Sequence, residues 1–156
     1  MKWLLSFLIF TGSLATVLAQ KKNVDYVTLS KTELAGEVSA GAKVTVKLHF
    51  KIEKGYHTQS NKPSEEYFIP TVLKLDHVAG IKAGEVKYPD GKTEKVSGLD
   101  KPLSVYDEVF VVSVPLAISA QAQLPVTVTG TLNYQACQGA TCYPPKKLKF
   151  EFKLEK

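Results

Sequence analysis

Several stretches of the sequence alternate apolar and polar residues, and this alternation constrains the fold more than any other feature. Residues 43–52 read Lys-Val-Thr-Val-Lys-Leu-His-Phe-Lys-Ile, which places every second side chain on one face of a strand. Similar stripes run through residues 126–134 and 148–154. Shorter candidate strands are Val24 to Leu29, Thr71 to Leu75, Glu85 to Tyr88 and Val109 to Leu116. The pattern predicts seven strands and no long helix.

Turn-forming residues separate these stretches, for example Lys54-Gly55, Asn61-Lys-Pro63 and Pro89-Asp-Gly91. Seven short alternating strands separated by turns are typical of an all-β, immunoglobulin-like antiparallel β-sandwich. The longest expected loop runs from Pro89 to Leu103, and long loops on a rigid sandwich often carry function. Residues 63–67 are expected to form one short turn.

The first residues resemble a secretory signal peptide. A lysine at position 2 precedes an apolar run from Trp3 to Phe10, and Val17-Leu-Ala19 offers small residues at a cleavage point. A membrane anchor is the alternative, but the run is interrupted by residues 11–13 and is shorter than the roughly 20 residues that span a bilayer. We expect a signal peptide at 1–19 and one exported domain at 20–156.

The charge pattern argues against nucleic-acid binding. All 20 basic residues are lysines, spread along a chain of 156 residues with a formal net charge of +5. Nucleic-acid binders usually concentrate their charge and use arginine forks on phosphates and guanine. A solvated, mildly basic surface is the better interpretation.

The only two cysteines, Cys137 and Cys142, lie between two alternating stretches that read as a hairpin. A short disulfide loop of this size contributes only about 2 kcal/mol in the chain-entropy account. Pro144 and Pro145 already stiffen the loop exit. The pattern favours a redox-active pair over a structural staple, although both interpretations stay open.

A metal site is the third interpretation and the weakest. Zinc takes four protein ligands, or three with water, so the two cysteines would have to recruit from His49, His57 and His77. No second ligand pair at a recognisable spacing accompanies them. We therefore expect neither a metal nor a cofactor.

The segment Tyr134-Gln-Ala-Cys-Gln-Gly-Ala-Thr-Cys-Tyr-Pro-Pro145 resembles the active-site hairpin of the N-terminal periplasmic domain of the thiol:disulfide interchange protein DsbD. A looser resemblance extends over most of residues 20–156, including Gly55-Tyr-His57 and Leu103-Ser-Val-Tyr106. The family fold is an immunoglobulin-like sandwich. One departure is the spacing, because four residues separate the cysteines here and five do in well-known members.

The resemblance implies a thiol:disulfide oxidoreductase that works as a periplasmic electron shuttle. In the family a thioredoxin-like domain, fed by a membrane-embedded transporter, reduces the cysteine pair. The pair then reduces thioredoxin-like disulfide isomerases and cytochrome c maturation proteins. By position, Cys142 would form mixed disulfides with partners and Cys137 would resolve them.

The resemblance also suggests supporting residues. The family covers its cysteines with a cap loop, whose equivalent here is Ser97 to Leu103, with Leu99 or Leu103 as an apolar lid and Asp100 as an acid. His57 takes the place of a family tyrosine that faces the cysteines, and either accepts a proton or is a half-exposed strand-end residue. The supporting aromatic residues are Tyr106, Tyr134 and Tyr143. The alternative function is a non-enzymatic exported binding module whose disulfide braces one loop.

Overall fold

The computed structural model describes residues 24–155, and these residues form twelve β-strands. The predicted signal peptide at 1–19 lies outside the described residues. No helix in the described part of the chain is long and apolar enough to cross a membrane. The fold is an immunoglobulin-like antiparallel β-sandwich, as the alternating pattern predicted.

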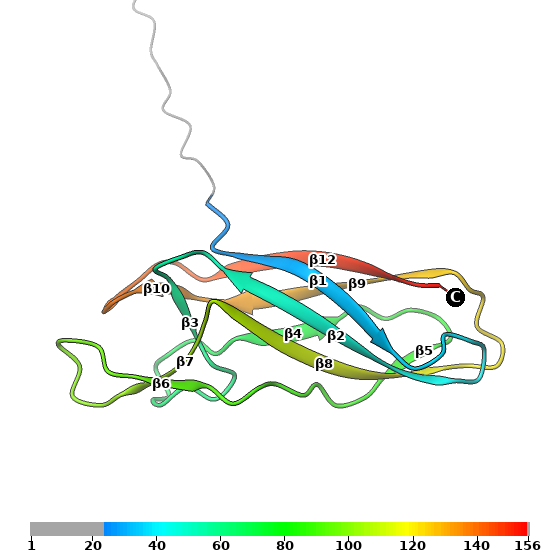
Figure 1. Cartoon of the computed structure of the whole chain (residues 1–156), viewed down its shortest axis with the longest axis horizontal. Coiled ribbons are helices and arrows are strands. Elements are labelled where there is room, and N and C mark those ends of the chain that lie inside the picture. The colour runs from blue at the N-terminus through cyan, green and yellow to red at the C-terminus, as the bar shows by residue number, and fades with distance from the viewer. Residues whose placement is uncertain (1–23, 156) are drawn as a thin grey trace, which may run out of the picture.

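Two sheets form the layers of the sandwich (Figure 1). One sheet has four strands, in the order β1 (Val27–Ala35), β2 (Lys43–Ile52), β8 (Val109–Ile118) and β5 (Ile81–Ala83). The other has three, in the order β12 (Lys146–Leu154), β9 (Val126–Tyr134) and β4 (Val72–Leu75). All the pairings are antiparallel, and β9 and β12 form the predicted hairpin, with Val126 opposite Leu154 and Tyr134 opposite Lys146.

The main core lies between these sheets and consists of the apolar faces of the alternating strands. Phe50 on β2 bridges the layers, because its ring lies 5.4 Å from that of Phe110 and 5.6 Å from that of Phe150 on β12. Gly130 on β9 leaves room for this packing, since a Cβ there would lie 2.7 Å from Phe150 Cζ. Burying one such phenylalanine contributes roughly 1.5–3 kcal/mol.

A third sheet of five short strands closes one end of the sandwich. Its order is β11 (Thr141–Cys142), β10 (Ala136–Gln138), β3 (His57–Gln59), β7 (Leu103–Asp107) and β6 (Lys92–Glu94). Figure 1 shows β3, β6, β7 and β10 gathered at this end. This sheet contains both cysteines.

The three central strands of the end sheet continue directly from sandwich strands. Residues 53–56 join β2 to β3, Glu108 alone joins β7 to β8, and Gln135 alone joins β9 to β10. Glu108 makes the sharp corner with a positive φ of 49°, and its carbonyl accepts a hydrogen bond from Ile52 N at 2.7 Å. The end sheet is therefore anchored on the packed core through three short connections.

Some short elements differ from the expectations. The strand expected at Glu85–Tyr88 is only an isolated bridge, Lys87 with Ser113, while a strand not expected forms at Ile81–Ala83. Tyr88 instead turns its hydroxyl to accept a hydrogen bond from Leu73 N at 2.8 Å. The expected long loop, 89–103, contains the strand β6.

Candidate redox site

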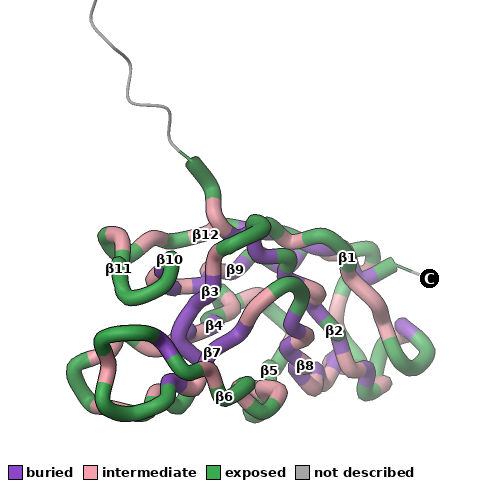
Figure 2. Tube along the Cα trace, turned by 60° about the vertical axis from the view of Figure 1, so that its left-hand side comes forward, coloured by how far each residue is buried: buried purple, intermediate pink, exposed green. Residues whose placement is uncertain are grey.

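Cys137 and Cys142 form a disulfide bond and lie directly opposite each other on β10 and β11. Their surroundings differ, because Cys137 has no exposed surface and Cys142 is exposed. Figure 2 shows this change along the hairpin, from buried strand at its base to exposed chain at its tip. Cys142 therefore lies at the surface, where a reagent or partner can approach it, whereas Cys137 is enclosed by protein.

A row of four residues crosses the end sheet at the cysteines. Cys142 pairs with Cys137, Cys137 pairs with His57 on β3, and His57 pairs with Asp107 on β7. Directly opposed residues of antiparallel strands project their side chains to the same face, with Cβ atoms about 4.5–5.5 Å apart. The register therefore brings the predicted residue His57 next to the buried cysteine.

His57 is buried, contrary to the half-exposed interpretation of the sequence, and it lies among acidic groups. Its Nδ1 atom is 3.6 Å from Glu94 Oε2 on β6, and Asp107 forms an ion pair with Lys92. Burial lowers the pKa of the imidazole below its ordinary value, while the charges of Glu94 and Asp107 act in the opposite direction. The imidazole is consequently neutral near pH 7.

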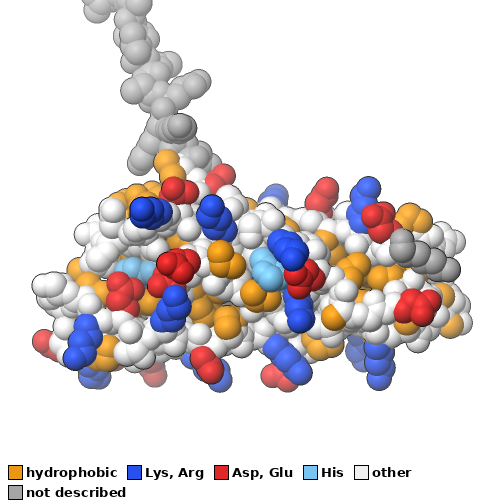
Figure 3. Space-filling view, viewed as in Figure 1, with side chains coloured by type: hydrophobic (Ala, Val, Ile, Leu, Met, Phe, Trp, Pro, Cys, Tyr) orange, Lys and Arg blue, Asp and Glu red, His pale blue; other side chains and the backbone are white. Residues whose placement is uncertain are grey.

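A hollow of about 560 Å³ opens beside this row. Its wall includes His57, Glu94 and Asp107, and it extends to Gly139 in the turn of the cysteine hairpin. The remaining lining residues come from the end of β2, from the connection to β3 and from the junction of β7 with β8. They are Lys51, Ile52, Glu53, Lys54, Gly55, Tyr56, Glu108 and Val109. Charged side chains of both signs surround the hollow, and Figure 3 shows the same mixture over this face of the molecule.

Three tyrosines hold the exit of the hairpin. Tyr143 follows Cys142, and its ring lies 5.1 Å from that of Tyr26 and 5.8 Å from that of Tyr56. The rings of Tyr26 and Tyr56 are 4.7 Å apart. Two hydrogen bonds add to this anchorage, because Tyr143 N donates to Ala136 O at 2.9 Å and the side-chain Nε2 of Gln135 donates to Tyr143 O at 3.0 Å. The backbone beside Cys142 is thus fixed although Cys142 itself is exposed.

The loop predicted as a cap, Ser97 to Leu103, lies between β6 and β7, and its last residue, Leu103, is the first residue of β7. Leu103 is buried with Val96 and Val105 in a small second core, against which Leu99 and Phe68 pack. Asp100 is exposed and lines a separate pocket with Leu99 and Leu103. Figures 1 and 2 both place this loop at the same end of the molecule as the cysteine hairpin. The cap role itself stays a prediction.

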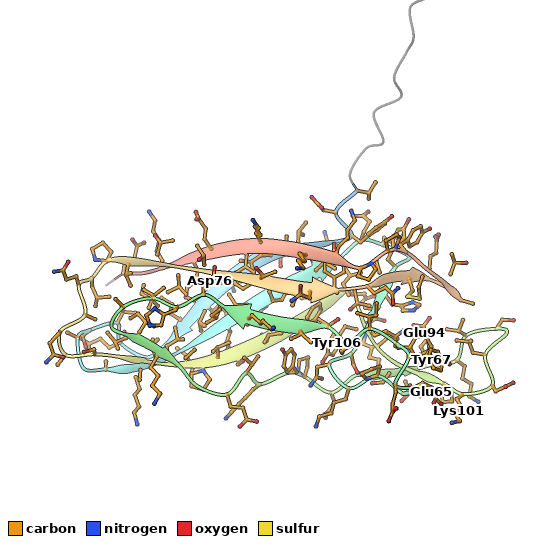
Figure 4. All side chains as sticks on the ribbon, turned by 180° about the vertical axis from the view of Figure 1, so that it is seen from behind. Glu65, Tyr67, Asp76, Glu94, Lys101 and Tyr106 are labelled. Atoms are coloured by element: carbon orange, nitrogen blue, oxygen red, sulfur yellow. A yellow bond between two sulfur atoms is a disulfide. The ribbon has the colours of Figure 1, made fainter. Side chains whose placement is uncertain are left out.

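An ion pair also attaches this loop to the segment around Glu65. Lys101 forms an ion pair with Glu65 at 2.6 Å, and the pKa of Lys101 is raised by its hydrogen bond to that carboxylate. In Figure 4 the labelled residues Glu65, Tyr67 and Lys101 lie together at this end of the molecule. A short turn forms at residues 65–68, where Phe68 N donates to Glu65 O at 3.2 Å, slightly later in the chain than the turn expected at 63–67.

The other two predicted tyrosines belong to the main core. Tyr106 stacks on Phe110 at 4.6 Å, and its hydroxyl donates to Asn61 Oδ1 at 2.7 Å. Tyr134 is also buried there, on the last residue of β9. Burial raises the pKa of both hydroxyls. Through packing they position β7, which carries Asp107, and β9, which leads through Gln135 into β10 with Cys137.

Sequence reasoning missed Glu94, Asp107 and Tyr26. Glu94 and Asp107 meet His57 only through strand pairings between segments far apart in the chain. Tyr26 precedes a strand whose pattern gives no sign of the aromatic contact with Tyr143. Among residues 24–155, no group of three or more His, Cys, Asp or Glu side chains is arranged to hold a metal ion.

A family model described as "Thiol:disulfide interchange protein DsbD, N-terminal" matches residues 27–154. The chain belongs to the DsbD N-terminal family. Its match runs from the first residue of β1 to the last residue of β12 and so includes the disulfide hairpin. Membership, together with the Cys137–Cys142 disulfide, assigns thiol–disulfide exchange as the general chemistry of the domain.

A solved structure of a related domain shares this fold. The N-terminal periplasmic domain of ScsB from Proteus mirabilis is 15% identical, with a TM-score of 0.56 over 87% of this chain and 49% of that one. The DsbD N-terminal domain of Neisseria meningitidis in the reduced form is 24% identical, with a TM-score of 0.48 over 80% and 85% of the chains.

A complex between the DsbD N-terminal and PilB N-terminal domains of Neisseria meningitidis is also similar. Its matching chain is 23% identical, with a TM-score of 0.42 over 77% of this chain and 79% of that one. Comparison with the curated proteins gives no match.

Proposed function

We propose that this DsbD N-terminal domain shuttles electrons between thioredoxin-like proteins outside the cytoplasm, with Cys142 as the cysteine that partners attack and Cys137 as the resolving cysteine. The observation that carries the proposal is the unequal exposure of the two bonded cysteines. Thiol–disulfide exchange requires in-line access of a thiolate to one sulfur, so the exposed sulfur is the one that can react with another protein.

The cycle has two halves. In the first, a thiolate of a reduced partner attacks Cys142 Sγ, the Cys137–Cys142 bond breaks, and Cys137 leaves as a thiolate that takes up a proton. The second thiol of that partner then releases Cys142, and the partner becomes a disulfide. In the second half, the Cys142 thiolate attacks an acceptor disulfide, and Cys137 displaces the acceptor as a dithiol while the domain disulfide re-forms.

The family and the predicted signal peptide support an extracytoplasmic location and thioredoxin-like partners. The proposed donor is a thioredoxin-like protein or a membrane reductant. The proposed acceptors are periplasmic disulfide isomerases and cytochrome c maturation proteins of thioredoxin-like fold. Small redox proteins of this kind meet their partners transiently, through modest interfaces that suit a single exposed hairpin.

Single-cysteine variants test these roles. With the resolving thiol removed, Cys137→Ser is expected to accumulate a mixed disulfide through Cys142 when it is mixed with an oxidised thioredoxin-like protein. Cys142→Ser keeps only the buried thiol and is expected to accumulate at least tenfold less, because burial limits access to the thiolate. Equal accumulation would remove the assigned roles. No accumulation by either variant would favour a binding module with a structural disulfide.

A further inference from the structure

The buried position of Cys137 creates a problem for the second half of the cycle. Once the pair is reduced, Cys137 carries a thiol, and it must lose that proton before its sulfur can attack Cys142. Cys137 has no exposed surface, so bulk water does not reach the thiol directly. Burial also disfavours a thiolate, which makes a neighbouring proton acceptor valuable at this position.

One basic side chain lies directly opposite Cys137. The Cys137–His57 pairing places the imidazole on the same face of the sheet as the sulfur. The His57 side chain is only 5% exposed, and its Nδ1 faces Glu94 at 3.6 Å. Its buried Nε2 atom has no hydrogen-bond partner among the described residues.

His49 also has a buried Nε2 atom without a hydrogen-bond partner, but of these two histidines it is His57 that pairs with a cysteine. A buried polar atom normally has a hydrogen-bond partner, because an unsatisfied one costs about 1–3 kcal/mol. In the disulfide form neither sulfur carries a proton, so neither can donate to His57. Reduction converts Cys137, which pairs directly with His57, into a thiol, and a thiol is a hydrogen-bond donor that the disulfide form does not offer.

We propose that His57 Nε2 accepts the Cys137 thiol proton when Cys137 resolves a mixed disulfide at Cys142, and that Glu94 holds the ring through Nδ1. This inference rests on the proposed function. His57 acts as a general base and Glu94 is a positioning residue.

The step balances in atoms and electrons. The Cys137 S–H bond breaks and its proton moves to His57 Nε2. The sulfur then attacks Cys142 Sγ, the Cys137–Cys142 bond forms, and the bond from Cys142 to the partner breaks. The partner sulfur leaves with the electron pair, so the partner is reduced and the domain pair is oxidised. The imidazolium later releases its proton, for which the half-exposed Glu94 offers a route to solvent.

The charges around the ring support this role. Carboxylates reach it from two strands, Glu94 on β6 and Asp107 on β7, and Lys92 neutralises part of the Asp107 charge. The neighbouring hollow adds Glu53, Glu108, Lys51 and Lys54 on its wall. Burial lowers the pKa of His57, so the ring starts neutral and able to accept a proton, and the two carboxylates then stabilise its charged form.

Glutathione disulfide separates the two steps in an experiment. It reacts first with Cys142 of the reduced domain, which forms a Cys142–glutathione mixed disulfide, and Cys137 then displaces glutathione. Acid-quenched samples analysed by mass spectrometry give the rate of each step. We expect His57→Gln to leave the first step within about twofold of wild type and to slow the second at least tenfold at pH 7, the lower end of general-base effects.

The pH profile distinguishes a base from a structural role. The wild-type rate of the second step is expected to level off above the pH at which His57 loses its proton. The His57→Gln rate should instead keep rising about tenfold per pH unit, because it then depends on the fraction of Cys137 ionised by hydroxide alone.

A second histidine provides the matched control. His49 Nε2 lies 3.5 Å from Glu33 Oε2 on the four-stranded sheet, so His49→Gln and Glu33→Gln remove a similar pair away from the cysteines. Both controls are expected to resolve glutathione at the wild-type rate. Glu94→Gln removes a charge that raises the His57 pKa, so it weakens the base and slows the second step by less than His57→Gln does.

The outcomes separate this inference from the proposed function. If wild-type Cys142 forms no mixed disulfide, the proposed function fails and the inference fails with it. If the mixed disulfide forms normally but His57→Gln resolves it with the wild-type rate and pH profile, the base role alone is overturned. If His57→Gln does not fold, Glu94→Gln decides, because a wild-type second step in that variant contradicts the inference.

Discussion

The rings of Tyr26 and Tyr143 stack with their centroids 5.1 Å apart, which fastens the residue after Cys142 to the residue before β1. Tyr56 completes the contact from the connection between β2 and β3. Burial next to the other two rings raises the pKa of the Tyr56 hydroxyl, so it stays protonated at neutral pH. The exposed Cys142 is in this way held on a backbone with little freedom, a combination that suits the proposed exchange with partners.

Removing one ring tests this anchorage. Tyr143→Ala deletes two aromatic contacts, so we expect the free energy of unfolding to fall by about 1–3 kcal/mol. In the reduced protein we also expect faster alkylation of Cys142. The control is Tyr67→Ala, because Tyr67 is 73% exposed and its ring contacts Phe68 alone among the described aromatic pairs. Equal losses of stability in the two variants, measured by urea unfolding, would contradict the anchoring role.

Reduction of the disulfide is expected to leave the domain folded. The cysteines are five positions apart, and a loop this short contributes about 2 kcal/mol. The strand β10 is also retained by its pairing with β3. The measurement is the thermal transition of the protein with and without a reductant, for which we expect a shift of several degrees and no loss of the folded state. Unfolding on reduction would support a structural staple.

The buried His57 should make stability depend on pH. Its pKa is lower in the folded protein than in the unfolded chain, so at acidic pH the unfolded state binds more protons. Its contribution is therefore fully present above about pH 6.5, the ordinary histidine value, and declines as the pH falls below that value. Urea unfolding of the oxidised protein at pH 7.5 and 5.5 should show a smaller acid loss in His57→Gln than in wild type. A loss of equal size in both would show that other groups govern this range.

The predicted shielding of the cysteines by the loop Ser97 to Leu103 can be tested with substitutions that leave the second core intact. Leu103 is buried in the second core, so replacing it would cost stability, and Leu99 together with Lys101 is the better choice. Leu99→Gly with Lys101→Ala removes one apolar contact and the ion pair with Glu65. We expect the reduced Cys142 thiol to be alkylated a few times faster, with unfolding free energy within about 1 kcal/mol of wild type. An unchanged alkylation rate would show that this loop does not shield the cysteines.

The sequence predicted the parts of the fold in which alternation reports one-sided burial. Residues 43–52 and 126–134 form strands with the bounds expected, because their side chains alternate between core and solvent. The strand His57–Gln59 gives no such signal, since all three of its residues are buried and polar. Turn residues at 89–91 similarly obscured the short strand Lys92–Glu94.

In the candidate site, too, the sequence predicted the residues of a local motif but not the contacts between distant segments. Cys137 and Cys142 were recognisable because they lie in one short motif whose residues carry the resemblance. The contact between His57 and Glu94 joins strands β3 and β6, which are not neighbours even within the end sheet. Such a contact depends on where three separate segments are placed in the folded sheet, and no local pattern in one sequence encodes it.

The reduction potential of the Cys137–Cys142 pair in the folded protein tests the central claim most directly. The purified domain is equilibrated in thioredoxin redox buffers, and its thiols are trapped and counted by mass spectrometry while circular dichroism monitors the fold. Exposed, exchangeable disulfides have potentials above about −300 mV, the upper limit of typical structural disulfides. We predict a reversible titration above that value with an unchanged spectrum. A pair that stays oxidised until the domain unfolds would contradict the account.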